Sequence, residues 1–267
     1  MKGFLLLLLI AVECFAQVKP GARQIALAHS DVACGDDVFS LFNNPAGLSA
    51  VTSREIGAYY SPAPFEMKEL SNAFGAYCEP TDFGNVSAGF SIYGFELYKE
   101  TQVALGFGRQ LFRNFSAGIT AIYKNISIKN YGSAGKVLLN IGATAKISDK
   151  FSFGFAADNI TRSTINDESN QIPTQFIIGA NAKLAKELLI NLALNKEIGY
   201  NASVMFGTEY TLIDFLRLRF GISNEPNMYS GGFGILYNFM QVDYAVSKHP
   251  DLGFTHQFGV IIRLARN

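Results

Sequence analysis

Large apolar side chains alternate with small or polar ones along most of the chain, which predicts β-strands. Val103, Leu105 and Phe107 share one face of a strand, because successive side chains of a strand point to opposite sides. The same period recurs between turns rich in Pro, Gly, Asn and Asp. The predicted strands are the fourteen segments 54–61, 68–79, 84–93, 97–110, 115–129, 136–147, 151–159, 174–184, 188–197, 202–212, 215–224, 229–238, 240–247 and 252–264.

The composition of the two strand faces distinguishes a barrel from a sandwich. In 151–156 the Phe side chains occupy one face, and Ser152, Gly154 and Ala156 occupy the other. A soluble sandwich would carry Lys, Glu and Thr on its outward face, whereas small residues suit the crowded interior of a barrel. We therefore predict an all-β fold, a transmembrane antiparallel β-barrel of about 14 strands, an even number as bacterial single-chain barrels require.

Composition and charge agree with a wall that faces lipid. Hydrophobic residues make up 49% of the chain and charged residues 16%, below the roughly 25% of ordinary soluble domains. The 22 basic and 22 acidic residues cancel, which argues against a nucleic-acid surface because such a surface needs a basic excess. The partner that composition predicts is outer-membrane lipid.

The first sixteen residues have the organisation of a secretory signal. Lys2 precedes an apolar stretch at 4–12, and Cys14-Phe15-Ala16 supplies small residues at the cleavage site. The stretch is too short for a membrane-spanning helix, which needs about 20 residues. Lipidation at Cys14 is the alternative, and Glu13 before it fits that poorly.

The segment 22–50, ARQIALAHSDVACGDDVFSLFNNPAGLSA, does not alternate. It opens with a helical pattern and closes on a compact turn, in which Pro45 biases Asn44 away from helix and Gly47 can take a positive φ. We predict that it lies in the lumen as a hatch. The predicted organisation is a signal peptide at 1–16, a hatch segment at 17–52 and a barrel at 53–267.

Two stretches resemble a known family. ARQIALAHSDVACGDDVFSLFNNPAGL, at the start, is similar to the N-terminal signature of the PorV/PorQ-like proteins, a branch of the FadL-type outer-membrane barrels, with Ala28-His29 where glycines are usual. VDYAVSKHPDLGFTH, at 242–256, is the second match. The motif residues that we single out are Asp36, Asp37, Asn43, Asn44, Pro45, Ala46, Gly47 and Leu48 in the hatch, and Asp243, Tyr244, His249, Pro250, Gly253 and His256 in the C-terminal hairpin.

The resemblance implies a fourteen-stranded, multi-pass protein of the bacterial outer membrane that recognises partners and performs no chemistry. Two features depart from the family. The chain is short, so its surface loops must be small, and it ends Leu264-Ala265-Arg266-Asn267 where many such barrels end on an aromatic residue.

The adjacent carboxylates Asp36 and Asp37 favour a structural role. Neighbouring side chains diverge on a helix or strand, so the two do not form an acid/base pair by themselves. They can cap a helix beginning near Val38 or pair with inward-facing Arg or Lys of the barrel. A ligand or ion role is the remaining alternative.

Other groups that could carry chemistry have simpler explanations. His249, Asp251 and His256 do not supply the convergent set that zinc needs, and the Gly-rich stretch 131–136 lacks P-loop spacing. With no catalytic triad in view, we expect no enzyme activity, metal or cofactor. Cys34 and Cys78 can pair in an exported protein, but two small buried residues are the favoured interpretation.

Two functions remain open for the lumen and loops. Following the resemblance, the barrel is a component associated with type IX secretion that binds exported proteins or the secretion apparatus. Alternatively, it is a FadL-like transporter of hydrophobic small molecules with a movable hatch, in which Leu41 and Phe42 contact the ligand rather than only pack against the wall. A transporter needs an apolar path that reaches the wall where strands part. The polar residues expected along the lumen wall are Gln102, Lys124, Lys146, Glu209 and Arg263.

Overall fold

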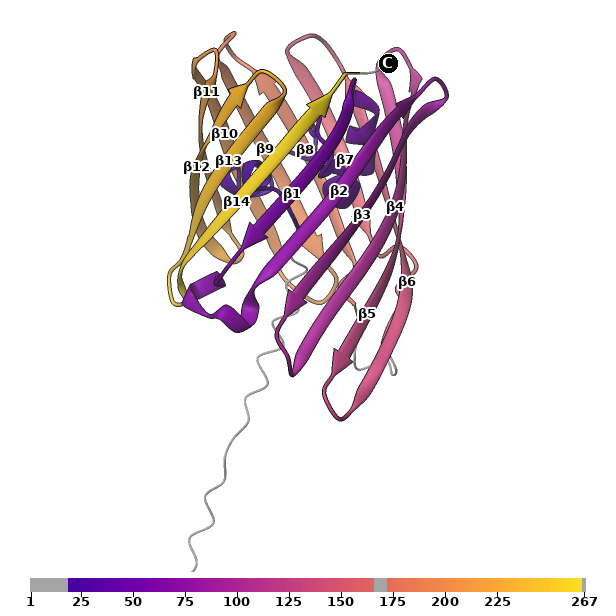
Figure 1. The fold of residues 1–267 in the computed structure, drawn as a ribbon. Coiled ribbons are helices and arrows are strands. Elements are labelled where there is room, and N and C mark those ends of the chain that lie inside the picture. The colour runs from indigo at the N-terminus through magenta and orange to yellow at the C-terminus, as the bar shows by residue number, and fades with distance from the viewer. Residues whose placement is uncertain (1–18, 166–171, 266–267) are drawn as a thin grey trace, which may run out of the picture.

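The computed structural model describes residues 19–165 and 172–265, in which fourteen antiparallel strands form a closed barrel (Figure 1). Each strand pairs with the next, and β1 pairs with β14 from Arg54↔Leu264 to Tyr60↔Phe258. The strands are β1 (Arg54–Ser61), β2 (Asn72–Thr81), β3 (Gly84–Gly94), β4 (Tyr98–Phe112), β5 (Phe115–Ile128), β6 (Gly132–Lys146), β7 (Phe151–Asp158), β8 (Gln175–Lys183), β9 (Leu188–Glu197), β10 (Ala202–Ile213), β11 (Leu216–Asn224), β12 (Asn227–Tyr237), β13 (Met240–His249) and β14 (Gly253–Leu264).

The predicted strand number is confirmed, and two strand starts differ from expectation by four residues. The second strand begins at Asn72 rather than 68, because the short 3₁₀ turns η2 (Pro64–Glu66) and η3 (Lys68–Leu70) come first. Phe65 and Glu66 have positive φ, which an extended strand cannot accommodate. The sixth strand begins at Gly132, whose φ of 102° closes a tight turn against Ile128.

The two faces of the wall are as the alternation predicted. On β4, Val103 and Leu105 are 57% and 62% exposed on the outside, and Ala104 between them is fully buried. Among the polar residues expected in the lumen, Gln102, Lys124 and Glu209 are buried and Arg263 is partly buried. The prediction for Lys146 is wrong, because it ends β6 at the rim of the barrel and is exposed to solvent.

Residues 19–53, called the hatch below, fill the lumen (Figure 1, indigo ribbon inside the barrel). The hatch contains α1 (Ala22–Ala26), α2 (Ser40–Asn43) and the 3₁₀ helix η1 (Pro45–Ala50). α1 packs against β11 to β14, and η1 packs against β3 to β6. The boundaries predicted for the signal and hatch segments stay predictions, and the signal peptide at 1–16 lies outside the described residues.

No helix among residues 19–165 and 172–265 is long and apolar enough to cross a membrane.

Glycines of the wall let the hatch approach the barrel backbone. A Cβ at Gly118 would lie 2.3 Å from the carbonyl of Pro45, and one at Gly154 would lie 2.3 Å from the oxygen of Val32. Both distances are too short for real Cβ atoms, so only glycine fits where two backbones come this close. We call the glycine ring the wall glycines at which an added Cβ would lie less than 3.0 Å from a backbone or side-chain atom of the hatch. They are Gly57, Gly89, Gly106, Gly108, Gly118, Gly142, Gly154, Gly179, Gly207, Gly221 and Gly232.

The turn that ends the hatch motif differs in one respect from expectation. Asn44 has an extended backbone with φ of −149°, as expected of a residue that precedes proline. Gly47, expected to use a positive φ, does not have one. It is required instead by space, because a Cβ there would lie 2.6 Å from the Gly35 oxygen and from Ser40 Oγ.

We predict that Gly118→Val displaces the hatch. The new side chain overlaps the Pro45 backbone, and such overpacking costs about 1–3 kcal/mol. Hydrogen exchange of residues 40–50 in detergent should accelerate accordingly. Ala121→Val, on the outward face of the same strand, is the control and should leave exchange unchanged. Equal protection in both variants would contradict a role for the glycine ring.

Candidate functional site

A network of buried charges fastens the hatch to one side of the barrel. Arg23 of α1 contacts Asp36 of the hatch and places its Nε 3.2 Å from Oε2 of Glu209 on β10. The same Glu209 oxygen accepts from Arg219 Nε of β11 at 2.7 Å. Arg219 Nη1 lies 2.6 Å from Asp243 Oδ1 of β13. Arg23, Glu209, Arg219 and Asp243, called the hatch anchor below, therefore link the hatch to three strands.

The carboxylate of Asp37 supports the backbone where α2 begins. Its Oδ1 accepts the N–H of Phe39 at 2.9 Å, and its Oδ2 accepts from Gln24 Nε2 at 2.8 Å. Burial raises the pKa of Asp37. The nearest basic side chain is Arg23, 3.8 Å away, so the arginine comes from the hatch and not from the barrel wall. The barrel contributes Glu55 of β1, which accepts the N–H of Val38 at 2.9 Å.

The rest of the hatch motif is held by backbone hydrogen bonds. Asn44 Nδ2 donates to the Val32 oxygen at 2.6 Å, and its Oδ1 accepts the N–H of Ala46 at 3.1 Å. Asn43 Nδ2 donates to the Pro20 oxygen at 2.9 Å. These amides fix the turn to earlier hatch residues, so the motif acts mainly as a brace within the hatch.

The opposite side of the hatch is apolar. Leu41 and Leu48 pack onto Gly106 of β4, and Phe42 meets Phe74 of β2 edge-to-face with ring centroids 5.3 Å apart. These side chains belong to one buried cluster that continues along the lumen wall. The other members that matter below are Ala104, Ile122, Leu138, Ile165 and Ile172, with Ile126 and Ala134 packed against it. We call this set, with the hatch residues Leu41, Phe42 and Leu48, the apolar face.

The regular strand pairing of the barrel wall is interrupted beside the apolar face. β5 and β6 pair along their whole length, from Phe115↔Ala145 to Ile128↔Gly132. β6 and β7 pair only from Ile141↔Ala157 to Lys146↔Ser152. β7 ends there, and the segment that follows it is held to β6 by single hydrogen bonds. The N–H of Ile160, for example, donates to the Leu139 oxygen at 2.9 Å. We call this place, at Val137 to Asn140 of β6, the seam.

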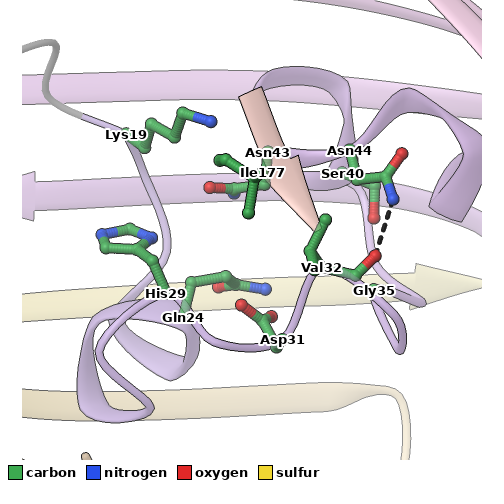
Figure 2. Close-up of a pocket in the computed structure, with 10 residues that line it drawn as sticks. All are labelled: Lys19, Gln24, His29, Asp31, Val32, Gly35, Ser40, Asn43, Asn44 and Ile177. Carbon is green, nitrogen blue, oxygen red and sulfur yellow. Dashed lines mark hydrogen bonds between the residues drawn. The ribbon is translucent and has the colours of Figure 1, made fainter. Parts of the chain in front are cut away.

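A small polar cavity lies between the two halves of the hatch (Figure 2). Its volume is about 20 Å³, room for about one water molecule. Burial, followed by the charge of Lys19, lowers the pKa of His29 to about 4. Burial also raises the pKa of Asp31 to about 6, against the opposing charge of Arg23. The lining residues are Lys19, Gln24, His29, Asp31, Val32, Gly35, Ser40, Asn43, Asn44 and Ile177.

The C-terminal motif divides between lumen and surface. Asp243 points inward and belongs to the hatch anchor, whereas Tyr244 Oη lies 2.7 Å from His256 Nδ1 at the outer surface. His249 Nδ1 accepts the backbone N–H of Asp251 and Leu252, both at 3.3 Å. The structure therefore does not bring His249 and His256 together. Pro250 and Gly253, with φ of 91°, shape the turn between β13 and β14.

Cys34 and Cys78 have free thiols. Cys34 Sγ lies 3.2 Å from Asn191 Oδ1, and Cys78 is buried on β2. Within the described ranges, no group of three or more His, Cys, Asp or Glu residues could hold a metal ion.

Sequence reasoning missed the partners of the hatch anchor. Arg23 and Arg219 were not singled out, although Arg219 alternates with apolar residues in the strand LRLRFGI, which also contains Arg217. Charged side chains within a membrane-spanning strand must face the interior and find a partner there. That signal marks Arg219 as inward, but its link to Glu209 and Arg23 depends on the fold.

Comparison with known proteins supports this architecture at the level of fold. No protein-family model matches the chain, and no curated protein matches it. Among solved structures, it resembles the CymD monoaromatic hydrocarbon channel, with a TM-score of 0.71 and 10% identity over 94% of this chain and 99% of that one. The Pseudomonas putida toluene transporter TodX gives a TM-score of 0.70 and 12% identity over 92% of this chain and 99% of that one.

A Pseudomonas aeruginosa FadL homologue also aligns, with a TM-score of 0.59 and 11% identity over 91% of this chain and 96% of that one. The fold is that of the FadL-type barrels. The chain thus has the fold of a multi-pass β-barrel of the outer membrane. These FadL-type neighbours are channels and transporters rather than enzymes.

We predict that Arg23→Met loosens the hatch. The substitution leaves the buried Glu209 without its hatch partner, and breaking one side of a buried ion pair costs about 3–5 kcal/mol. The measurement is protection of residues 22–37 from hydrogen exchange. Arg54→Met removes a pair with Glu79 that is about one third exposed, worth about 0–1 kcal/mol. The prediction is wrong if both variants change protection to the same small extent.

We also predict that Asp31→Asn stabilises the docked hatch at pH 7 and not at pH 4. The buried carboxyl has a pKa of about 6, above its ordinary value near 4, so docking weakens as pH rises through about 4 to 6. Removing the carboxyl should recover up to roughly 3 kcal/mol at pH 7, because each pKa unit corresponds to about 1.4 kcal/mol. Hydrogen exchange of variant and wild type at each pH isolates this difference, and a gain that persists at pH 4 would refute it.

Proposed function

We propose that this barrel passes hydrophobic small molecules across the outer membrane. The observation that carries the proposal is the apolar face, which extends from Leu41 and Phe42 on the hatch to Leu138 beside the seam. A hydrophobic solute that leaves water needs such an apolar surface. At the seam, Ile165 and Ile172 cover a stretch of wall where β6 has left its β7 ladder.

The distribution of hatch contacts supports the same function. The hatch anchor holds α1 to β10, β11 and β13 through ion pairs. The side at α2 and η1 meets β3 to β6 through apolar packing and single hydrogen bonds, such as Thr120 Oγ1 to the Leu41 oxygen at 2.9 Å. A solute on the apolar face therefore meets the part of the hatch with the weaker attachment.

The structural neighbours add independent support. They include a monoaromatic hydrocarbon channel and toluene transporters, and their barrels align over nearly their full length. At about 10% identity this likeness extends to the fold alone. We therefore infer the solute class from the apolar face of this chain, and these neighbours suggest small aromatic hydrocarbons as the first solutes to test.

A secretion-associated role is the second candidate. It is favoured by the burial of most hatch residues inside the lumen. The cavity between the two halves of the hatch, about 20 Å³, is far smaller than the roughly 300 Å³ at which ligand sites begin. The PorV/PorQ-like motifs at both ends of the sequence point the same way. In this role the barrel would bind exported proteins or parts of a type IX secretion apparatus, through loops such as 62–71.

We predict that Ile126→Asn reduces toluene uptake several-fold. The substitution places an amide on the apolar face, where a passing hydrocarbon cannot satisfy its hydrogen bonds. Uptake of radiolabelled toluene is measured in host cells that lack hydrocarbon channels of their own. Ser127→Asn, the next residue on the outward side of β5, is the matched control and should retain full uptake.

The same cells distinguish the two candidates. Toluene uptake above that of cells without the barrel supports transport. Absence of uptake, together with capture of exported proteins by the tagged barrel from its native membrane, would overturn transport and support the secretion role.

A further inference from the structure

An ion pair is buried in the lumen, apart from the hatch anchor. Lys124 Nζ of β5 lies 2.7 Å from Glu100 Oε2 of β4, and the two side chains are only 7% and 12% exposed. Tyr98 donates its hydroxyl to Glu100 Oε1 at 2.5 Å. These partners come from β4 and β5 alone, so the pair does not fasten the hatch to the wall.

The pair interrupts the apolar face. Lys124 lies between Ile122 and Ile126 on the same side of β5, because side chains two residues apart in a strand share a face. Removing two charges from water is costly, and well-packed apolar residues would often be at least as stable at such a position. Ionisable residues within a membrane-spanning segment are typically functional. A solute that follows the apolar face along β5 must pass this pair.

We propose that Lys124 and Glu100 select solutes that carry one neutral hydroxyl group on an apolar body, such as phenols. This inference rests on the proposed transport function and adds its specificity. The pair is neutral as a whole and offers a donor beside an acceptor. A hydroxyl can accept from Lys124 and donate to Glu100 at once.

Other solute chemistries match the pair less well. A carboxylate would accept from Lys124 but would be repelled by Glu100, and an ammonium group would meet the reverse. A pure hydrocarbon satisfies neither group. The pair can still bind a solute hydroxyl while its own contacts stay in place. The Lys124 ammonium has three N–H donors, and each oxygen of the Glu100 carboxylate can accept two hydrogen bonds. Tyr98 and Lys124 each use one acceptor position on Glu100.

The test compares three solutes of nearly equal shape: toluene, p-cresol and p-toluate. At pH 7 cresol is neutral and toluate is charged. Cells with the wild-type barrel should take up cresol faster than toluene, and toluate most slowly. In the double variant Lys124→Met/Glu100→Leu, which leaves no lone charge, the ratio of cresol to toluene uptake should fall by about tenfold, the effect of a lost hydrogen bond to a charged group.

Two further variants separate selectivity from folding. The exchange Lys124→Glu/Glu100→Lys keeps a neutral donor–acceptor pair and should restore the cresol preference. Lys129→Met removes the exposed pair with Glu96 on the same hairpin and should keep the wild-type ratio. Hydrogen exchange of the hatch should be unchanged in every variant used.

The outcomes distinguish the inference from the proposed function. Uptake of toluene and cresol in a ratio that the double variant does not change would overturn the selectivity and leave transport standing. Wild-type preference for toluate would also overturn it. Uptake of none of the three solutes would overturn the transport function itself.

Discussion

The close approach of two backbones, hatch against wall, is the constraint on which the rest of the structure depends. A lipid-embedded sheet must close on itself, because its backbone groups find no partners in hydrocarbon. A closed barrel then has a lumen of fixed size, and here that lumen also contains residues 19–53. Glycines such as Gly118 and Gly154 provide the space. The large side chains consequently lie on the outside, where lipid accommodates them.

The hatch is attached by different interactions on its two sides. Arg23 joins it to the wall by charge, in a buried setting where no group can lose its partner without a large penalty. Leu41, Phe42 and Leu48 join it by apolar contact. The difference arises in the wall itself. β10, β11 and β13 carry the inward charges of the hatch anchor, whereas β4 to β6 turn Ala104, Ile122 and Leu138 toward the hatch, and their own inward ion pair joins strands of the wall only.

Most of the fold could be predicted from the sequence, because period-two alternation reports directly which side chains face lipid. The start of the second strand was predicted wrongly because residues Lys68–Leu70 form a 3₁₀ turn. The inward position of Lys146 was predicted wrongly because the alternation continues past the rim of the barrel. Much less of the candidate site could be predicted. Arg23 and Glu209 are 186 positions apart in the chain, so their contact is created by barrel closure. We expected Gly47 to be needed for its backbone conformation, whereas the structure requires a glycine there because the Gly35 backbone leaves no space for a side chain.

The packed lumen and the proposed transport are compatible for an energetic reason. An apolar solute on the apolar face can replace the contacts that Phe42 or Leu48 would lose on moving, since dispersion and burial are not directional. No such solute can replace the partners of Arg23, because a hydrocarbon offers neither charge nor hydrogen bond. Solute binding therefore favours displacement of α2 and η1 while α1 stays anchored. A ligand shifts such an equilibrium only by its differential affinity for the two states, and the apolar face is where that difference arises.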